Sequence, residues 1–453
     1  MTPSRVDAPS TWRLDVAPGP SHQLARAYLW LGVAALIGSG VLAIVLVLSR
    51  TPGVSTVFPL RDLFRAALVV HVDLSVLIWF MAFAGAVWSL ATAPRWVGLG
   101  WLAWGLASAG TLAMAVSPFL PDAQPLLNNY IPILDQPVFM LGLGLCGLGF
   151  GLAILRTLVW GWGTASTQAE AKALHCGVML SALAGASAWV ALGWTSLQQP
   201  SGAGVAHYEV MFWGPGHTLQ FQHALLASVA WLWLAGAVGA PTRARGTTVQ
   251  RLFMLATLPL LAVPAIYVVW PAGTGEHVKA FADLMRHGHV LSLPLVALAL
   301  AVLPRVWRQA PSPASSALLA SVLLFSVGGV LAFMIRSINV VVPAHYHGSI
   351  VGVTLAFMGL SYVLLPRLGF GEADGRMARW QPWVYGGGQL THILGLAWSG
   401  GYGVQRKVAG AEQVLVSLPQ KLGMGMMGLG GLIAVAGGVM FVLVCLRAMR
   451  QRG

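Results

Sequence analysis

The amino-acid sequence predicts an all-α integral membrane protein, built as one bundle of about twelve transmembrane helices. Of the 453 residues, 57% are hydrophobic and only 9% are charged, whereas a soluble domain carries roughly 25% charged residues. Apolar runs of about twenty residues, the length that crosses a bilayer as a helix, recur along the whole chain. Because no long polar segment separates these runs, we expect a single membrane domain over residues 28–446, flanked by polar tails at residues 1–27 and 447–453.

The predicted spans follow one another through short connections. In order they cover residues 28–49, 66–91, 97–118, 134–159, 173–195, 209–239, 251–271, 281–304, 314–335, 344–366, 382–403 and 424–446. Glycine is frequent in several of them, and small residues let transmembrane helices pack closely. The first run is long enough to span, which indicates a membrane anchor rather than a cleaved signal peptide.

The basic residues indicate topology rather than nucleic-acid binding. The formal net charge is +13, but lysine and arginine are scattered between the apolar runs. Seventeen of the 26 lie in the two tails or in loops after even-numbered spans. By the positive-inside rule, both termini are predicted to be cytoplasmic, in a multi-pass protein of the cell (inner) membrane. The three cysteines lie in apolar runs without a Cys-x-x-Cys-His motif, so we expect neither a disulfide framework nor covalent haem.

Histidines converge on one depth of this predicted bundle. Spans 2, 6 and 10 carry histidines in their outer part, and three more follow span 7. Ionisable groups in a membrane are costly unless they are used, and neutral imidazole is the commonest metal ligand in proteins. The pattern therefore predicts a haem or metal site near the outer face. The seven histidines are His71, His217, His277, His287, His289, His345 and His347.

The most informative motif opens span 10, where His345 and His347 are separated by one residue. Helix positions i and i+2 point about 200° apart, so these imidazoles reach two different metals rather than one. The pair, placed in the tenth of twelve spans with a histidine in the second, resembles the haem–copper oxidoreductases, and the resemblance covers nearly the whole chain. It implies a subunit I-like fold with two haems, which we expect to be of type b. In that family pattern, His71 and His347 would bind the low-spin haem, and His345 the high-spin haem.

Span 6 carries a second match. Residues 212–221 read Phe-Trp-Gly-Pro-Gly-His-Thr-Leu-Gln-Phe, which resembles the Phe-Trp-x-x-Gly-His-Pro-Glu-Val-Tyr of oxygen-reducing members. The resemblance makes His217 a ligand of a non-haem copper or iron. Phe221 stands where many oxygen reductases carry a redox-active tyrosine and nitric oxide reductases a glutamate. This chain has neither there, although Gln220 precedes Phe221.

The end of span 7 departs from the family pattern. Family members carry a His-His pair there, whereas residues 266–270 of this chain read Ile-Tyr-Val-Val-Trp. The nearest histidines are His277, His287 and His289. A loop that folds back would bring His277 over His217 and give a two- or three-histidine site. The sequence therefore leaves undecided whether a non-haem metal is present, which metal it is, and which residues bind it beside His217.

Two polar segments resemble family partners of haem propionates. Residues 130–137 resemble a Tyr-Leu-Glu-x-Pro stretch of nitric oxide reductases, which would put Asp135 near propionates and a calcium ion; the alternative is an ordinary loop residue. Arg406 and Lys407, after span 11, resemble the basic pair that neutralises propionates, and charges held in low dielectric need such partners. The alternative is a membrane-flanking pair.

Three functions remain open: reduction of nitric oxide to nitrous oxide, reduction of oxygen as in cytochrome c oxidases, and non-catalytic haem electron transfer or gas sensing. Phe221 lacks the phenol that oxygen reductases use, and Tyr267 is the one plausible substitute. Span 8 has no lysine or threonine over residues 290–298, so an inner proton channel is not expected. Nitric oxide reduction is therefore favoured. Acidic residues on the outer side, which could supply protons, are Asp135, Glu209, Glu276 and Asp283.

The electron donor must come from outside this chain. The sequence has no haem c motif and no copper-thiolate pair. We therefore expect an electron-donating subunit or a soluble cytochrome c on the external side, with quinol as an alternative.

Overall fold

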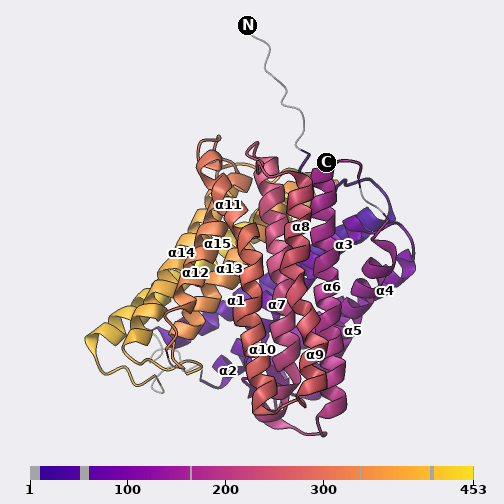
Figure 1. Ribbon diagram of the computed structural model, residues 1–453. Helices are drawn as coiled ribbons and strands as arrows, with labels where there is room; N and C mark the ends of the chain where they lie inside the picture. The colour runs from indigo at the N-terminus through magenta and orange to yellow at the C-terminus, as the bar shows by residue number, and fades with distance from the viewer. Residues whose placement is uncertain (1–10, 52–60, 164–165, 337, 409–412, 452–453) are drawn as a thin grey trace.

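The protein is an all-helical bundle with one small hairpin, as shown by a computed structural model that describes residues 11–51, 61–163, 166–336, 338–408 and 413–451 (Figure 1). The described residues form twelve continuous helical stretches. Two short antiparallel strands, β1 (Gln124–Leu126) and β2 (Ile133–Asp135), pair in the connection between the third and fourth stretches. The predicted all-α bundle of twelve helices is thus confirmed.

Nine stretches are regular helices. They are α1 (Pro20–Arg50), α4 (Val97–Val116), α5 (Pro137–Trp160), α6 (Ala169–Gln198), α7 (Gly204–Ala237), α12 (Pro313–Ala332), α13 (Val341–Arg367), α14 (Arg376–Gly401) and α15 (Leu418–Arg450), with a 3₁₀ turn, η2 (Ser117–Phe119), extending α4. Ten of the twelve stretches are long and apolar enough to cross a membrane by length and composition among the described residues. The other two, α7 and α14, bury polar side chains such as His217 and Gln381, which lowers their hydropathy.

Three stretches contain a change of helical geometry. The second runs through α2 (Arg61–Val72), a π-helical segment η1 (Asp73–Ile78) and α3 (Trp79–Ala91). The seventh consists of α8 (Gly246–Thr257), the 3₁₀ segment η3 (Leu258–Leu261) and α9 (Ala262–Val269). The eighth consists of α10 (Gly275–Gly288), the 3₁₀ segment η4 (His289–Ser292) and α11 (Leu293–Val306).

The eighth stretch begins earlier than hydropathy predicted. Its first residue is Gly275 rather than residue 281, because the Thr274 side chain caps the helix by accepting a hydrogen bond from the His277 amide (3.3 Å). The first turns of α10 carry charged residues, including the ion pair of Lys279 with Asp283. Because these turns are not apolar, hydropathy does not predict them as part of a membrane span. The expectation of a loop folding back was therefore wrong, because His277 lies in a helix.

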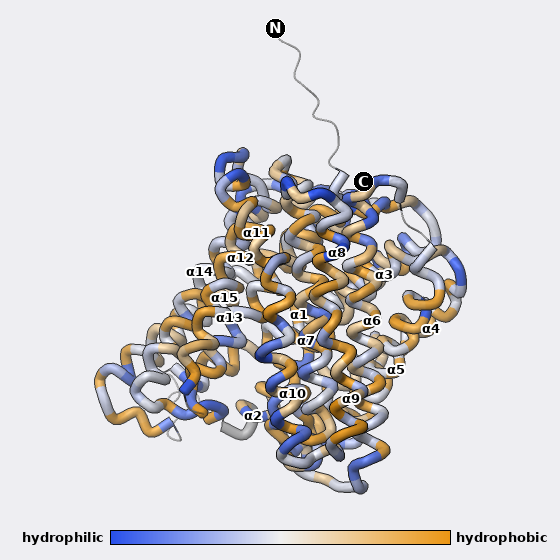
Figure 2. Tube along the Cα trace, in the orientation of Figure 1, coloured by the Kyte–Doolittle hydropathy of each residue, from blue (hydrophilic) through white to orange (hydrophobic). Residues whose placement is uncertain are grey.

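The bundle has two distinct ends. The described N-terminal segment and the end of α15 lie at one end, while α2 and α10 lie toward the other (Figure 1). The hairpin packs against α2, and the start of α13 lies near Arg50 at the end of α1. Figure 2 shows apolar residues along the middle of the helices and hydrophilic residues gathered at both ends, as a membrane-spanning bundle requires. We call the end opposite the chain termini the outer end.

Candidate functional site

Helix α13 lies at the centre of the bundle and carries two candidate ligands near its start. In the most apolar 18-residue segment of α13, 83% of the residues are buried inside the protein. The His345 Nδ1–H donates to the Gly328 carbonyl of α12 (2.8 Å). His347 instead lies against His392 of α14, with ring centroids 5.1 Å apart. The two imidazoles thus contact different helices, as their spacing of two residues requires.

His71 approaches the His347 side of α13 from α2. Its Nδ1–H donates to the Ser39 carbonyl of α1 (3.0 Å), and the Ser39 hydroxyl lies 2.9 Å from the same nitrogen. His347 lies within electrostatic range of His71, His392 and Arg50. The π-helical segment begins two residues after His71, and such segments are frequent at functional sites. His71 and His347 therefore belong to one cluster of side chains at the outer end, which we call the His71–His347 pocket.

Arg50 is a functional candidate that sequence reasoning missed. It ends α1, and its Nε and Nη2 atoms are buried with no hydrogen-bond partner among the described residues. Its charge acts on Tyr346, His347 and His392. Because leaving a buried charge unpaired costs several kcal/mol, this pocket suits an anionic group that also accepts two imidazole ligands. Such a group is a haem with its propionates, so the residues present fit the low-spin haem expected here.

A second cluster surrounds His217 on α7. The His217 Nδ1–H donates to the Trp213 carbonyl (2.7 Å), and the ring packs on Tyr130 at 4.6 Å between centroids. His277 is fully buried, and neither ring nitrogen has a partner among the described residues. The ring of Phe281 lies 5.0 Å from His277 and 6.3 Å from His217, so the two histidines flank one aromatic ring.

Three candidate ligands share one arrangement. In His71, His217 and His345, Nδ1 bonds to a backbone carbonyl. A neutral imidazole with its proton on Nδ1 has its lone pair on Nε2. Metal-bound histidines ordinarily have their other ring nitrogen held in this way. Each of these three histidines therefore has the Nε2 lone pair available to bind a metal.

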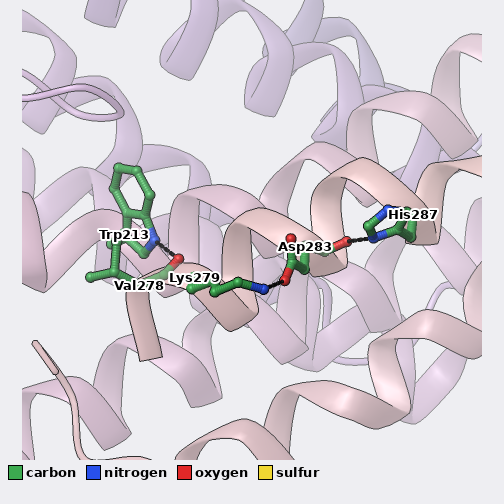
Figure 3. Close-up of polar contacts among 5 residues, drawn as sticks. All are labelled: Trp213, Val278, Lys279, Asp283 and His287. Carbon is green, nitrogen blue, oxygen red and sulfur yellow. Dashed lines mark hydrogen bonds and ion pairs between the residues drawn. The ribbon is translucent and has the colours of Figure 1, made fainter. Parts of the chain in front are cut away.

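His289 and His287 occupy opposite sides of the eighth stretch. His289 stacks on Phe221, with centroids 4.2 Å apart, and lies within electrostatic range of His217. His287 is exposed and bonds through Nδ1 to the Asp283 carbonyl (3.1 Å), on the face of α10 that also carries Lys279 (Figure 3). His287 therefore lies outside the cluster, contrary to expectation, because its helical position turns it away from α7.

The described part of the chain contains no group of three or more His, Cys, Asp or Glu side chains arranged to hold a metal ion. His217 and His277 come near each other, but the set expected of a three-histidine metal site is not assembled. The residues present therefore do not fit a non-haem metal held in that way.

Two tyrosines complete the surroundings of His217. Tyr267 of α9 is buried, packs beside His277 at 5.0 Å between centroids, and shares a 2.8 Å hydrogen bond with the Thr195 hydroxyl. Tyr130, which sequence reasoning gave no role, comes from the outer connection and accepts a hydrogen bond from Gln220 Nε2 (3.4 Å). Tyr130 is the first residue of the 130–137 segment, in which the family resemblance gives a role to Asp135 alone.

A polar network closes the outer end. Arg406 and Lys407 both donate to Asn129 Oδ1, and Lys407 also donates to the carbonyls of Leu127 and Asn128. Asn129 in turn donates to both carboxylate oxygens of Glu209 (2.9 and 2.5 Å). Burial, followed by the neighbouring Arg406 charge, lowers the pKa of Lys407 to about 8, although Glu209 opposes that shift.

Asp135 does not join this network. It is exposed at the end of β2, opposite Gln124. No hydrogen bond or ion pair links its side chain to the basic pair in the described residues, and Glu209 is the acid beside that pair. The expectation that Asp135 lies near haem propionates and a calcium ion stays a prediction, and in the described residues its side chain makes no contact with the basic pair that would support it.

Known proteins resemble this chain over most of its length. A protein-family model, Cytochrome C and Quinol oxidase polypeptide I, matches residues 23–439. An uncharacterized protein of Rickettsia prowazekii (strain Madrid E) is 31% identical over 511 aligned positions, covering 95% of this chain and 96% of the relative. An uncharacterized protein of Aquifex aeolicus (strain VF5) is 26% identical over 359 positions, covering 78% and 88%.

Among solved structures, a cryo-EM structure described as a heme-copper terminal oxidase dimer superimposes with a TM-score of 0.74. The match covers 96% of this chain and 85% of that chain, at 16% sequence identity. At this identity the likeness concerns the fold alone.

Proposed function

This chain belongs to the family of cytochrome c and quinol oxidase polypeptide I, the haem–copper oxidase subunit I, and we propose that it is a membrane oxidoreductase that reduces nitric oxide to nitrous oxide. The family supports an oxidoreductase whose members generally bind two haems. Two NO molecules, two electrons and two protons give one N₂O and one water. When bound, the haems supply the path for the electrons and an iron that binds the gas.

The chain's own residues divide into two haem pockets. His71 and His347 would hold the low-spin haem, with Arg50 supplying positive charge beside it. His345 would hold the high-spin haem, because its Nδ1–H donates to the Gly328 carbonyl and the lone pair of its Nε2 is available to bind iron. Arg406 and Lys407 would neutralise propionates at the outer end. We expect type b haems, while calcium and a copper or iron partner are left outside the reaction proposed here.

The observation that carries the proposal is Phe221. This side chain is 1% exposed and stacks on His289, one helical turn after His217. A phenyl ring can donate neither an electron nor a proton, so the position used for a tyrosine in many oxygen reductases is inert here. Reduction of NO needs fewer electrons per turnover than reduction of O₂, and therefore depends less on such a donor.

The proton supply favours the same function. Helix α11 (Leu293–Val306) is apolar until Arg305 at its inner end, and it offers no titratable path from the inner side toward His289. Carboxylates lie instead at the outer end, with Glu209 beside Asn129 and the Lys279–Asp283 pair on α10. Protons for turnover would therefore come from the outer side.

Oxygen reduction is the second candidate, and Tyr130 and Tyr267 favour it. Both phenols lie in the His217 cluster, with Tyr267 beside His277. Either could replace the tyrosine missing at residue 221. A non-catalytic haem carrier or gas sensor would need neither tyrosine nor any defined proton path.

We further propose the setting of this reaction. Residues 28–446 would form one haem-binding membrane domain, with cytoplasmic tails at 1–27 and 447–453. The electrons would come from a partner subunit or a soluble cytochrome c at the outer end, or from quinol. Nothing in the proposal involves nucleic acid.

The test is to purify the protein from membranes, measure its haem and metal content, and follow NO and O₂ consumption with the same reduced electron donor. We expect two haems per chain and NO consumption that exceeds O₂ consumption. Faster O₂ than NO consumption would support the second candidate, and two haems without turnover of either gas would support the carrier or sensor.

A further inference from the structure

A third histidine lies in the pocket of His71 and His347. His392 of α14 is half-buried, its ring centroid is 5.1 Å from that of His347, and the two rings are inclined by 49°. His392 also lies within electrostatic range of His71 and Arg50. Neither the span-10 motif nor the family resemblance gave this residue a role.

The position and tautomer of His392 are fixed by α15. Its Nδ1 lies 2.9 Å from the Met427 carbonyl, so Nδ1 carries the proton and donates it to that oxygen. The helices touch at Gly430, where an added Cβ would lie 2.3 Å from the His392 amide nitrogen. Because backbone meets backbone there, the imidazole cannot recede from the pocket. The Nε2 of His392 is left as a hydrogen-bond acceptor.

His347 differs from the other candidate ligands because its Nδ1 has no hydrogen-bond partner among the described residues. His71, His217 and His345 each bond Nδ1 to a backbone carbonyl. The His347 imidazole makes no hydrogen bond with any residue in the part of the chain that the structure describes. A metal-bound histidine almost always donates its other ring N–H to an acceptor, so His347 needs one once it binds iron.

We propose that His392 is the positioning residue of His347, with the His392 Nε2 accepting the hydrogen bond of the His347 Nδ1–H. With haem bound at His347, hydrogen bonds would link His347 through His392 to the Met427 carbonyl. Every proton stays on its own nitrogen, so no net transfer of charge is required. This inference rests on the assignment of His347 as a haem ligand under the proposed function, and it holds for either gas as substrate.

The arrangement has an electronic consequence. An acceptor on Nδ1–H makes the ligand imidazole more basic, which favours the ferric over the ferrous state. It also fixes the plane of the ring, to which the g-values of a ferric low-spin haem are sensitive. Removing the acceptor should therefore raise the reduction potential and move the g-values without removing the haem.

The test compares His392→Phe, which keeps an aromatic ring, with His392→Gln, which restores an acceptor. In His392→Phe we expect the reduced-to-oxidised ratio of the low-spin haem at fixed potential to rise on the order of tenfold, equivalent to about 59 mV. His392→Gln should return the ratio and the g-values toward those of the wild type. Leu394→Phe, at a 45% exposed position on the same helix, should change neither. Equal shifts in the Phe and Gln variants would mean that only ring packing matters and would overturn the proposal, as would wild-type values in His392→Phe.

A measurement on the unmodified protein covers the case in which both variants lose haem. In the reduced, CO-treated protein the haem irons are diamagnetic, and ¹⁵N solid-state NMR of labelled histidines reports the tautomer. We expect His392 to carry its proton on Nδ1 and to accept at Nε2, and the opposite tautomer overturns the proposal. Loss of the wild-type low-spin spectrum in His392 variants but not in His347→Ala would instead show that the underlying ligand assignment had failed.

Discussion

The ring of Tyr130 packs on the imidazole of His217, with 4.6 Å between the centroids, and so places a phenol beside the candidate metal ligand of α7. Tyr130 reaches this position from the outer connection, and an added Cβ at Gly216 would lie 2.2 Å from its ring. Burial raises the pKa of the Tyr130 hydroxyl above its ordinary range, although the hydrogen bond from Gln220 opposes this. The phenol therefore stays protonated at neutral pH, and the site has two tyrosines rather than none.

The two phenols give the first prediction. If the protein reduces NO without a tyrosyl electron donor, Tyr130→Phe and Tyr267→Phe should each leave the NO consumption rate within about twofold of the wild type. Stopped-flow or electrode measurements of NO and O₂ consumption would check this. A loss of roughly 100-fold or more in either variant would identify that phenol as a participant in electron or proton transfer and would contradict NO reduction without a tyrosine.

The second prediction concerns the low-spin haem. His71→Ala and His347→Ala should each abolish the bis-histidine optical signature, because each removes one of the two imidazoles that would hold the low-spin haem. The reduced-minus-oxidised spectrum of purified protein measures this directly. Ser75→Ala, which removes a hydroxyl that donates to the His71 and Val72 carbonyls (2.6 and 3.5 Å), serves as the control. An unchanged low-spin spectrum in either histidine variant would show that its ligand assignment is wrong.

The third prediction separates the two haem pockets. His345→Ala should remove CO binding to the reduced protein and leave the low-spin spectrum in place, because His345 bonds to α12 while His347 faces α14. Ser349→Ala is a matched control, since its hydroxyl donates to the His345 carbonyl (3.2 Å) and to no other group among the described residues. Normal CO binding in His345→Ala would contradict the assignment.

The fold was largely predictable because lipid imposes a simple rule on the sequence. Each crossing needs a long apolar run, so hydropathy located all twelve stretches, even where η1, η3 and η4 change the helical geometry. The rule failed at the start of α10, where an N-cap and charged residues make a helix that is not apolar. The π-helical segment after His71 leaves no mark on hydropathy, because it changes the hydrogen-bond pattern rather than the composition.

The candidate site was predictable only where one motif carried it. The spacing of His345 and His347 on α13 required their side chains to point in opposite directions, and in the structure His345 contacts α12 while His347 contacts α14. His392 and Arg50 stand alone in the sequence, and only packing of α1, α14 and α13 brings them together. The same holds for Tyr130, which reaches His217 through the hairpin connection.

The fourth prediction follows from the pKa of Lys407, which is lowered to about 8 by burial and by Arg406. Below that pKa the ammonium is positive, and positive charge near a haem raises its reduction potential. The potential should therefore fall as pH rises through about 8, or somewhat higher if a bound propionate restores part of the pKa. Lys407→Arg should remove this step while keeping the charge, because arginine stays protonated throughout. Redox titrations between pH 6 and about 10 would check it, and an unchanged step in Lys407→Arg would assign it to another group.

The fifth prediction concerns the side from which protons are taken. Because α11 offers no titratable path from the inner end and carboxylates lie at the outer end, turnover should consume protons from the outer side and pump none. In liposomes with the outer end facing the medium, an external electron donor and an internal pH dye separate the two sources. We expect NO consumption with no alkalinisation of the interior, both with and without a protonophore.

Fast O₂ consumption with alkalinisation inside would overturn both the outer proton source and the preference for NO, since it would require a path through the bundle. Tyr267→Phe in the same liposomes would then distinguish a catalytic phenol from a packing residue, because only the former would silence that activity while leaving both haem spectra unchanged.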